Sequence, residues 1–150
     1  MIKLSSLTLV KSSCSCDTCK SYCIRPCWPT PAQAQALIDA GYAASLMMDW
    51  WVGNSFKDND SDIYILCPAT KGRGGDRALN NPTEIPCIMQ NKKGLCKLHD
   101  AGLKPLEGSH VSCKAHKDER KLHEAVAESW NNQEAQDLVQ HWKELVGFRF

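Results

Sequence analysis

The sequence has almost no net charge and no long apolar run. Its 18 Lys and Arg residues nearly balance its 17 Asp and Glu residues, which leaves a formal net charge of +1. This balance provides no basic excess for a nucleic-acid partner and no acidic tail. No stretch approaches the roughly 18 apolar residues of a membrane helix. We therefore expect neither a nucleic acid nor a membrane among the partners.

The first residues lack the features of a secretion signal. The stretch MIKLSSLTLVKSSC holds two lysines and only broken apolar pieces, whereas a signal peptide has a continuous apolar core of roughly 7–15 residues. We therefore expect a cytoplasmic protein. Disulfides are rare in that compartment, and the nine cysteines form an odd number. Dense cysteines in a reducing compartment favour metal ligation instead.

Familiar catalytic patterns are also missing. The sequence contains neither H-E-x-x-H nor the H-x-E and P-C-x-x-C pair of zinc deaminases. Asp49 and Asp100 are lone carboxylates, which we interpret as helix caps or surface charges. His123 and His141 fall on predicted helices, where a solvated surface position is the ordinary role. These observations favour a binding protein over an enzyme.

The central part of the chain carries clear helix signals. Thr30 is a good N-cap, Pro31 suits the first helical position, and Gly41 suits the position after the helix end. Apolar residues at helical spacing then predict a second helix over 42–51, apolar on most sides and central to the core. The stretch 63–69, IYILCPA, is the best strand candidate. Residues 70–86, which include KGRGG, are expected to form an exposed flexible loop.

The C-terminal part predicts two further helices within 117–147. Asn131 or Asn132 separates them, and the second has a clean apolar stripe that ends before Gly147. At 150 residues the chain is expected to form one domain, 1–150. The predicted fold class is mainly α: a small metal-stabilised domain with cysteine-rich loops, a central helical pair, C-terminal helices and at most a short β element.

Two loops concentrate the residues that bind metals. Residues 14–31, CSCDTCKSYCIRPCWPTP, hold five of the nine cysteines. Cys16 and Cys19 form C-x2-C, a spacing that lets two thiolates reach one ion from a single turn. The second loop, 87–116, contains further donors, namely Cys87, Cys96, His99, His110, Cys113 and His116. Structural zinc takes four such ligands, so the metal loops 14–29 and 87–116 hold enough donors for two ions.

Dense cysteines also occur in redox pairs and in iron–sulfur clusters. A thioredoxin-like redox pair needs C-x-x-C beside a βαβ pattern, and here three more cysteines crowd the motif while the helix begins only at residue 31. An iron–sulfur cluster is harder to separate from zinc, because four cysteine ligands serve both. Zinc and [4Fe-4S] therefore both stay open at this stage.

The segments CDTCKSYC, CIMQ…GLCKLHD and KPLEG resemble the CxxCxxCC family of zinc- or iron-chelating domains. The resemblance covers roughly Cys14 to Cys113, although Cys23 follows after three residues and the family's adjacent cysteine pair is missing. It implies that five cysteines are the main ligands: Cys16, Cys19, Cys23, Cys87 and Cys96. Cys113 lies near the family's last cysteine, and we add Cys27 and His99 as further candidates. Cys14, Cys27 and Cys67 match only weakly.

Together these features predict a zinc-binding protein with one or two zinc ions in a structural site, which acts by binding another protein. The alternative is an iron–sulfur or open-site zinc protein with redox or transferase activity. Some relatives in the CxxCxxCC family are domains of protein methylases, which keeps that enzymatic alternative open. No catalytic residue is predicted.

Overall fold

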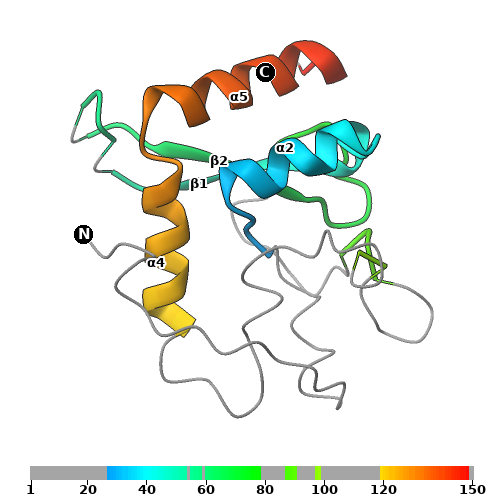
Figure 1. The fold of residues 1–150 in the computed structure, drawn as a ribbon, viewed down its shortest axis with the longest axis horizontal. Helices are drawn as coiled ribbons and strands as arrows, with labels where there is room; N and C mark the ends of the chain where they lie inside the picture. The colour runs from blue at the N-terminus through cyan, green and yellow to red at the C-terminus, as the bar shows by residue number, and fades with distance from the viewer. Residues whose placement is uncertain are drawn as a thin grey trace.

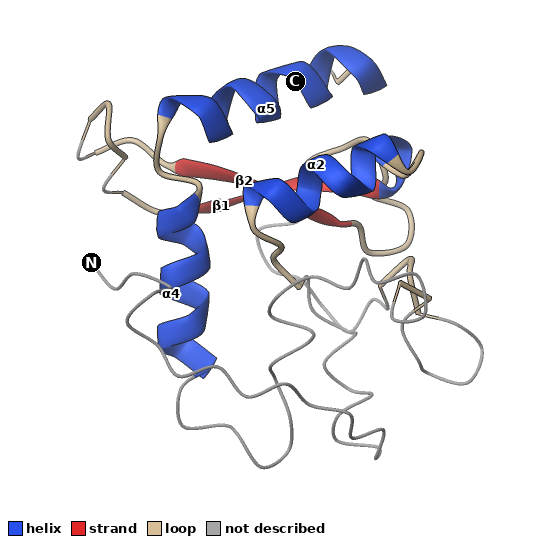
Figure 2. Ribbon diagram, viewed as in Figure 1, coloured by secondary structure: helices blue, strands red, loops and turns tan. Residues whose placement is uncertain are grey.

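The computed structural model describes residues 27–53, 55–58, 60–78, 87–90, 97–98 and 119–148. In chain order the elements are α2 (Pro31–Asp39), the 3-10 helix η3 (Ala43–Ser45), β1 (Leu46–Trp51), β2 (Ile63–Pro68), α4 (Glu119–Ser129) and α5 (Gln133–Val146). The two strands form an antiparallel hairpin at the centre. Helices α2 and α5 lie along this hairpin, while α4 stands at one of its ends (Figures 1 and 2). None of the described helices combines the length and apolar character that a membrane span requires.

Helix α2 forms where the sequence predicts it. The Thr30 hydroxyl accepts the Gln33 amide N–H at 3.3 Å, and the Gln33 side chain accepts the Thr30 N–H at 3.0 Å, so both halves of a capping box are present. At the other end Gly41 has φ of +93°, a conformation that favours glycine. The Tyr42 amide then donates to the Leu37 carbonyl at 2.9 Å and closes the helix end.

The predicted second helix is wrong. Residues 46–51 form strand β1, which pairs with β2 in a register that joins Leu46 to Pro68 and Trp51 to Ile63. Leu46, Met47 and Met48 are all buried in succession, as expected for a strand that is covered on both faces. Periodicity alone does not show whether a short apolar run of this kind is a buried strand or part of a buried helix. The 63–69 strand and both C-terminal helices are confirmed.

The predicted fold class is therefore wrong as a whole. A β-hairpin occupies the centre of the molecule in place of a central helical pair, so the fold is not mainly α. The described part of the chain packs around apolar side chains of all its elements, including Leu37, Met48, Ile65, Trp130 and Trp142. It contains no group of three metal-binding side chains. This apolar core holds the described elements together.

Other parts of the chain form hydrogen bonds with backbone groups on both outer edges of the hairpin. On the β1 side, the Met48 backbone donates to and accepts from the 76–78 segment, with N···O distances of 3.0 and 2.9 Å. On the β2 side, the Gln136 side-chain amide of α5 donates to the Tyr64 carbonyl at 3.0 Å. Backbone groups at a sheet edge otherwise remain open to pairing with another chain.

The KGRGG stretch is a largely exposed turn, as predicted, but hydrogen bonding to β1 and close packing against η3 hold it in place, which the prediction of a flexible loop did not anticipate. The Gly75 amide donates to the Leu46 carbonyl at 2.8 Å, and Arg73 forms an ion pair with Asp76 at 3.4 Å. Gly74 lies so close to η3 that a Cβ on it would come within 2.4 Å of the Ala44 carbonyl oxygen. No real Cβ approaches a backbone oxygen that closely, so this position requires glycine.

Replacing Gly74 with alanine should therefore destabilise the protein. The new methyl group must push the turn away from η3, and forced overpacking of this kind typically costs about 1–3 kcal/mol. Urea unfolding followed by circular dichroism would measure the change. Lys71→Ala, at an exposed position of the same turn, should stay within about 0.5 kcal/mol of the wild type. Equal stability of the two variants would contradict the close contact.

Candidate functional site

Two of the eight predicted metal ligands, Cys27 and Cys87, lie within the described residues. The other six lie outside them: Cys16, Cys19, Cys23, Cys96, Cys113 and His99. Cys14, His110 and His116 also lie outside. The structure therefore shows the surroundings of two candidate ligands, one from each cysteine-rich segment.

Cys87 begins a tight turn in which a backbone N–H is directed at the sulfur of Cys87. The Met89 amide N–H donates to the Cys87 Sγ at an N···S distance of 3.4 Å, and the Gln90 amide closes the turn on the Cys87 carbonyl at 3.0 Å. An amide N–H aimed at a sulfur favours the thiolate, which is the form that binds metals. The turn at Cys87 thus directs a backbone N–H at a candidate ligand sulfur.

The Cys87 turn is attached to the core. Cys87 forms an antiparallel bridge with Thr70, just beyond the end of β2, and is itself 6% exposed. The Lys97 amide returns to the same turn and donates to the Met89 carbonyl at 2.7 Å, and the neighbouring Leu98 is fully buried. The chain on both sides of the 91–96 segment is therefore fixed to one place in the fold.

Cys27 is followed directly by a tryptophan that anchors the chain. The Trp28 indole N–H donates to the Asp49 carboxylate on β1 at 2.9 Å. The Trp28 ring stacks on the His123 imidazole of α4, with a centroid distance of 3.6 Å and an interplanar angle of 22°. Trp51 meets both rings edge-on, at 6.1 Å from Trp28 and 5.5 Å from His123. These four side chains, Trp28, Asp49, Trp51 and His123, form what we call the Trp28 cluster.

The Trp28 cluster overturns two expectations from the sequence. Asp49 is neither a cap nor a surface charge, since burial raises the pKa of its carboxyl above the ordinary 3.8. The hydrogen bonds from Trp28 and the Trp50 amide, and the charge of His123, act in the opposite direction. His123 is half-buried against Trp28 and is not a solvated surface residue. His141, by contrast, is exposed as expected.

The raised pKa of Asp49 predicts how its variants respond to pH. A carboxyl whose pKa is higher in the folded chain holds its proton more tightly there, so its contribution to folding falls as pH rises through that range. Asn at this position still offers an oxygen to Trp28 without a buried charge. Asp49→Asn should therefore be at least as stable as the wild type at pH 7, and its advantage should shrink toward pH 3.5.

Urea unfolding of both proteins between pH 3.5 and 7 would check this. Asp60→Asn, at an exposed position on the β1–β2 loop, serves as the matched control for the loss of one carboxylate. An Asp49→Asn protein that loses stability relative to the wild type as pH rises would show that the Asp49 charge supports the fold.

No group of three His, Cys, Asp or Glu side chains placed to hold a metal occurs within the ranges that the structure describes. The sequence offers no local signal for the Trp28 cluster either, because its members come from a loop, a strand and a distant helix. Only the position of Trp28, directly after the last cysteine of the first segment, marks it as a residue of interest.

Comparison with known proteins adds no relative: no family model, no curated protein and no solved structure matches the chain. The resemblance to the CxxCxxCC family stays a prediction from the quoted motifs.

Proposed function

We propose that the protein binds zinc through its two cysteine-rich segments and that the ion has a structural role there. The observation that carries this proposal is the turn at Cys87, whose sulfur accepts the Met89 amide at 3.4 Å. Thiolates and imidazoles are the donors that zinc takes in its four-coordinate structural sites, and the chain holds nine cysteines and five histidines. Cys87 and Cys27 would each supply one sulfur.

The zinc would organise the cysteine-rich segments and not the core. Trp28 and the Cys87 turn are already attached to β1 and β2 by hydrogen bonds that involve no metal. Zinc bound by Cys27 and Cys87 would connect the chain next to Trp28 and the Cys87 turn to the other cysteine and histidine ligands of the two segments. Since ligands in a structural site are all supplied by the protein, such an ion leaves no open position for a substrate.

We propose further that the protein acts in the cytoplasm by binding another protein. The Asp49 carboxyl, whose pKa burial raises, is held by the Trp28 indole N–H within the Trp28 cluster. A reducing compartment keeps cysteines available as thiolates for metal. Binding, rather than acid–base chemistry, is the role that this arrangement supports.

Elemental analysis of protein produced without added metal tests the zinc proposal. We expect one or two zinc ions per chain and a colourless solution. A brown protein that contains iron and acid-labile sulfide would support the iron–sulfur alternative instead. Metal at trace levels only would contradict both and would favour disulfides among the cysteines.

A further inference from the structure

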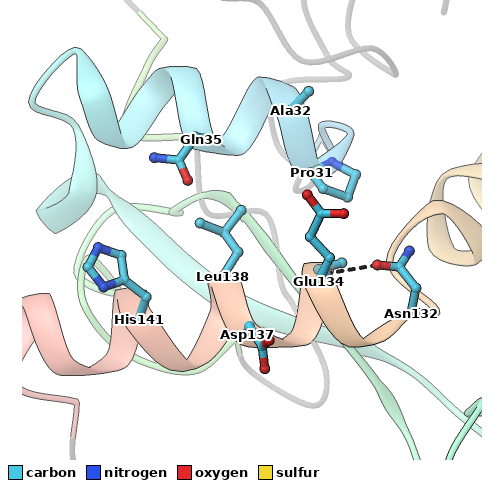
Figure 3. A pocket seen from close by; sticks show the side chains of 9 residues that line it. Pro31, Ala32, Gln35, Asn132, Glu134, Asp137, Leu138 and His141 are labelled. Atoms are coloured by element: carbon cyan, nitrogen blue, oxygen red, sulfur yellow. Dashed lines mark hydrogen bonds between the residues drawn. The ribbon is translucent and has the colours of Figure 1, made fainter.

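Helices α2 and α5 leave an open groove between them, with a volume of about 580 Å³ (Figure 3). Helix α2 contributes Ala32 and Gln35, and α5 contributes Glu134, Leu138 and His141. The groove exists because the facing side chains near one end are small. Pro31 and Ala32 begin α2, and Ala135 lies opposite on α5, so the helices approach without filling the space between them. Its volume lies within the usual range of binding sites, roughly 300–1,000 Å³.

The α5 wall of the groove carries a regular stripe. Glu134, Leu138, His141 and Leu145 follow one another at i, i+4, i+7 and i+11, which places them on one helix face. Leu138 points toward α2 in Figure 3 and is half-buried, while Leu145 is 53% exposed. Leu138 also packs against the edge of the core, whose fully packed side chains on α5 are Val139 and Trp142. Leu138 and Leu145, which lies beyond the residues that line the groove, thus form a short apolar stripe on this face that is only partly covered.

The groove is negatively charged. Glu134 and Asp137 line it, and no lysine or arginine does so. The Glu134 carboxylate points toward the start of α2 (Figure 3), and neither acid forms an ion pair within the described part of the chain. Asp39 lies one turn beyond Gln35 on α2 and accepts a hydrogen bond from it at 2.9 Å. Acidic groups beside an apolar stripe suit a partner with the reverse charge.

We propose that this groove binds an amphipathic helical segment of a partner protein, with lysine or arginine residues beside an apolar stripe of its own. The apolar residues would cover Leu138 and Leu145, and the cations would meet Glu134 and Asp137. Laying an amphipathic helix into a groove is a recurring mode of peptide recognition. This inference rests on the proposed protein-binding role, for which it names the partner chemistry, and it does not depend on zinc.

Fluorescence anisotropy with a defined probe tests the proposal. The probe is a fluorescein-labelled, 14-residue amphipathic peptide of leucine, alanine and lysine, and its twin carries glutamate at every lysine position. We expect saturable binding of the lysine peptide and no binding of the glutamate twin. Glu134→Lys combined with Asp137→Lys should weaken binding at least tenfold. Asp58→Lys with Asp60→Lys, on the exposed β1–β2 loop, changes the net charge equally and should stay within twofold of the wild type.

A second variant separates the groove from a general effect on folding. Leu138→Ala with Leu145→Ser leaves the charge unchanged and should weaken binding at least fivefold even in high salt, where surface charges are screened. Circular dichroism of every variant confirms that α5 is intact. Equal weakening by the loop variant, or unchanged binding by both groove variants, would overturn the proposal. Zinc content is measured on the same samples. If the peptide does not bind the groove but the protein still contains zinc, only the groove proposal is contradicted.

Discussion

Cys87→Ser should lose bound zinc, whereas Cys67→Ser should retain it. A four-coordinate site that loses one thiolate keeps three ligands and an open position, so its affinity for the metal should collapse. The Cys87 sulfur lies in a turn that directs an amide N–H at it. Cys67 is buried on β2, and its thiol faces the Met47 carbonyl of β1 at 3.9 Å. The two cysteines are thus comparable in burial but differ in what surrounds the sulfur.

The serine variants of Cys16, Cys19, Cys23 and Cys96 should behave like Cys87→Ser. Elemental analysis of each purified variant gives the number of zinc ions per chain, and the wild type provides the reference. Serine at Cys67 should reduce only stability, by about 1–3 kcal/mol for a buried hydroxyl. A Cys87→Ser protein with its full complement of zinc would show that the second segment does not ligate the ion. Loss of zinc from Cys67→Ser would place that residue in the site instead.

Trp130→Ala should remove much of the stability of the fold. Trp130 is fully buried at the junction of α4 and α5, and its indole N–H donates to the Pro29 carbonyl at 2.9 Å. Truncating a buried tryptophan to alanine typically costs about 3–5 kcal/mol. That is a large share of the roughly 5–15 kcal/mol that stabilises an ordinary domain. We therefore expect Trp130→Ala to be largely unfolded near physiological temperature.

A second variant separates the two contributions of Trp130. Trp130→Phe keeps most of the apolar volume but leaves the Pro29 carbonyl without its donor, so a smaller loss of about 1–3 kcal/mol is expected. Gln140→Ala, on the exposed side of α5, should have no measurable effect. Urea unfolding monitored by circular dichroism ranks the three proteins. If Trp130→Ala were as stable as Gln140→Ala, the junction of α4 and α5 would contribute little to the fold.

Helix boundaries were predictable because the interactions that determine them are local. The Thr30 and Gln33 capping pair lies within four residues, and the Asn132 side chain accepts the Ala135 amide three residues later at 2.8 Å. Such contacts depend on the identity of a few neighbouring residues. The sequence alone therefore places α2 and the break before α5 within a residue or two.

Strand β1 was not predictable in the same way, because its partner lies elsewhere in the chain. Met48 pairs with Leu66, and the 76–78 segment covers its other side. Pairing with these distant residues outweighs the helical spacing of the local apolar side chains. The Trp28 cluster was missed for the same reason, since Trp28, Asp49 and His123 meet only after the hairpin and α4 have assembled. The candidate metal ligands, by contrast, rest on residue type, spacing and the resemblance to the CxxCxxCC family, and they stay predictions.

The hydrogen bonds on the outer edges of the β1–β2 hairpin limit how this protein can join other molecules. The Met48 backbone is already paired with the 76–78 segment, and the Tyr64 carbonyl is held by Gln136. A strand from another chain would have to displace these groups before it could extend the sheet, so neither fibril-like stacking nor strand exchange has an easy starting point at these positions. Recruitment of another protein would then take place on helical surfaces, where side chains rather than backbone groups decide which partner is accepted.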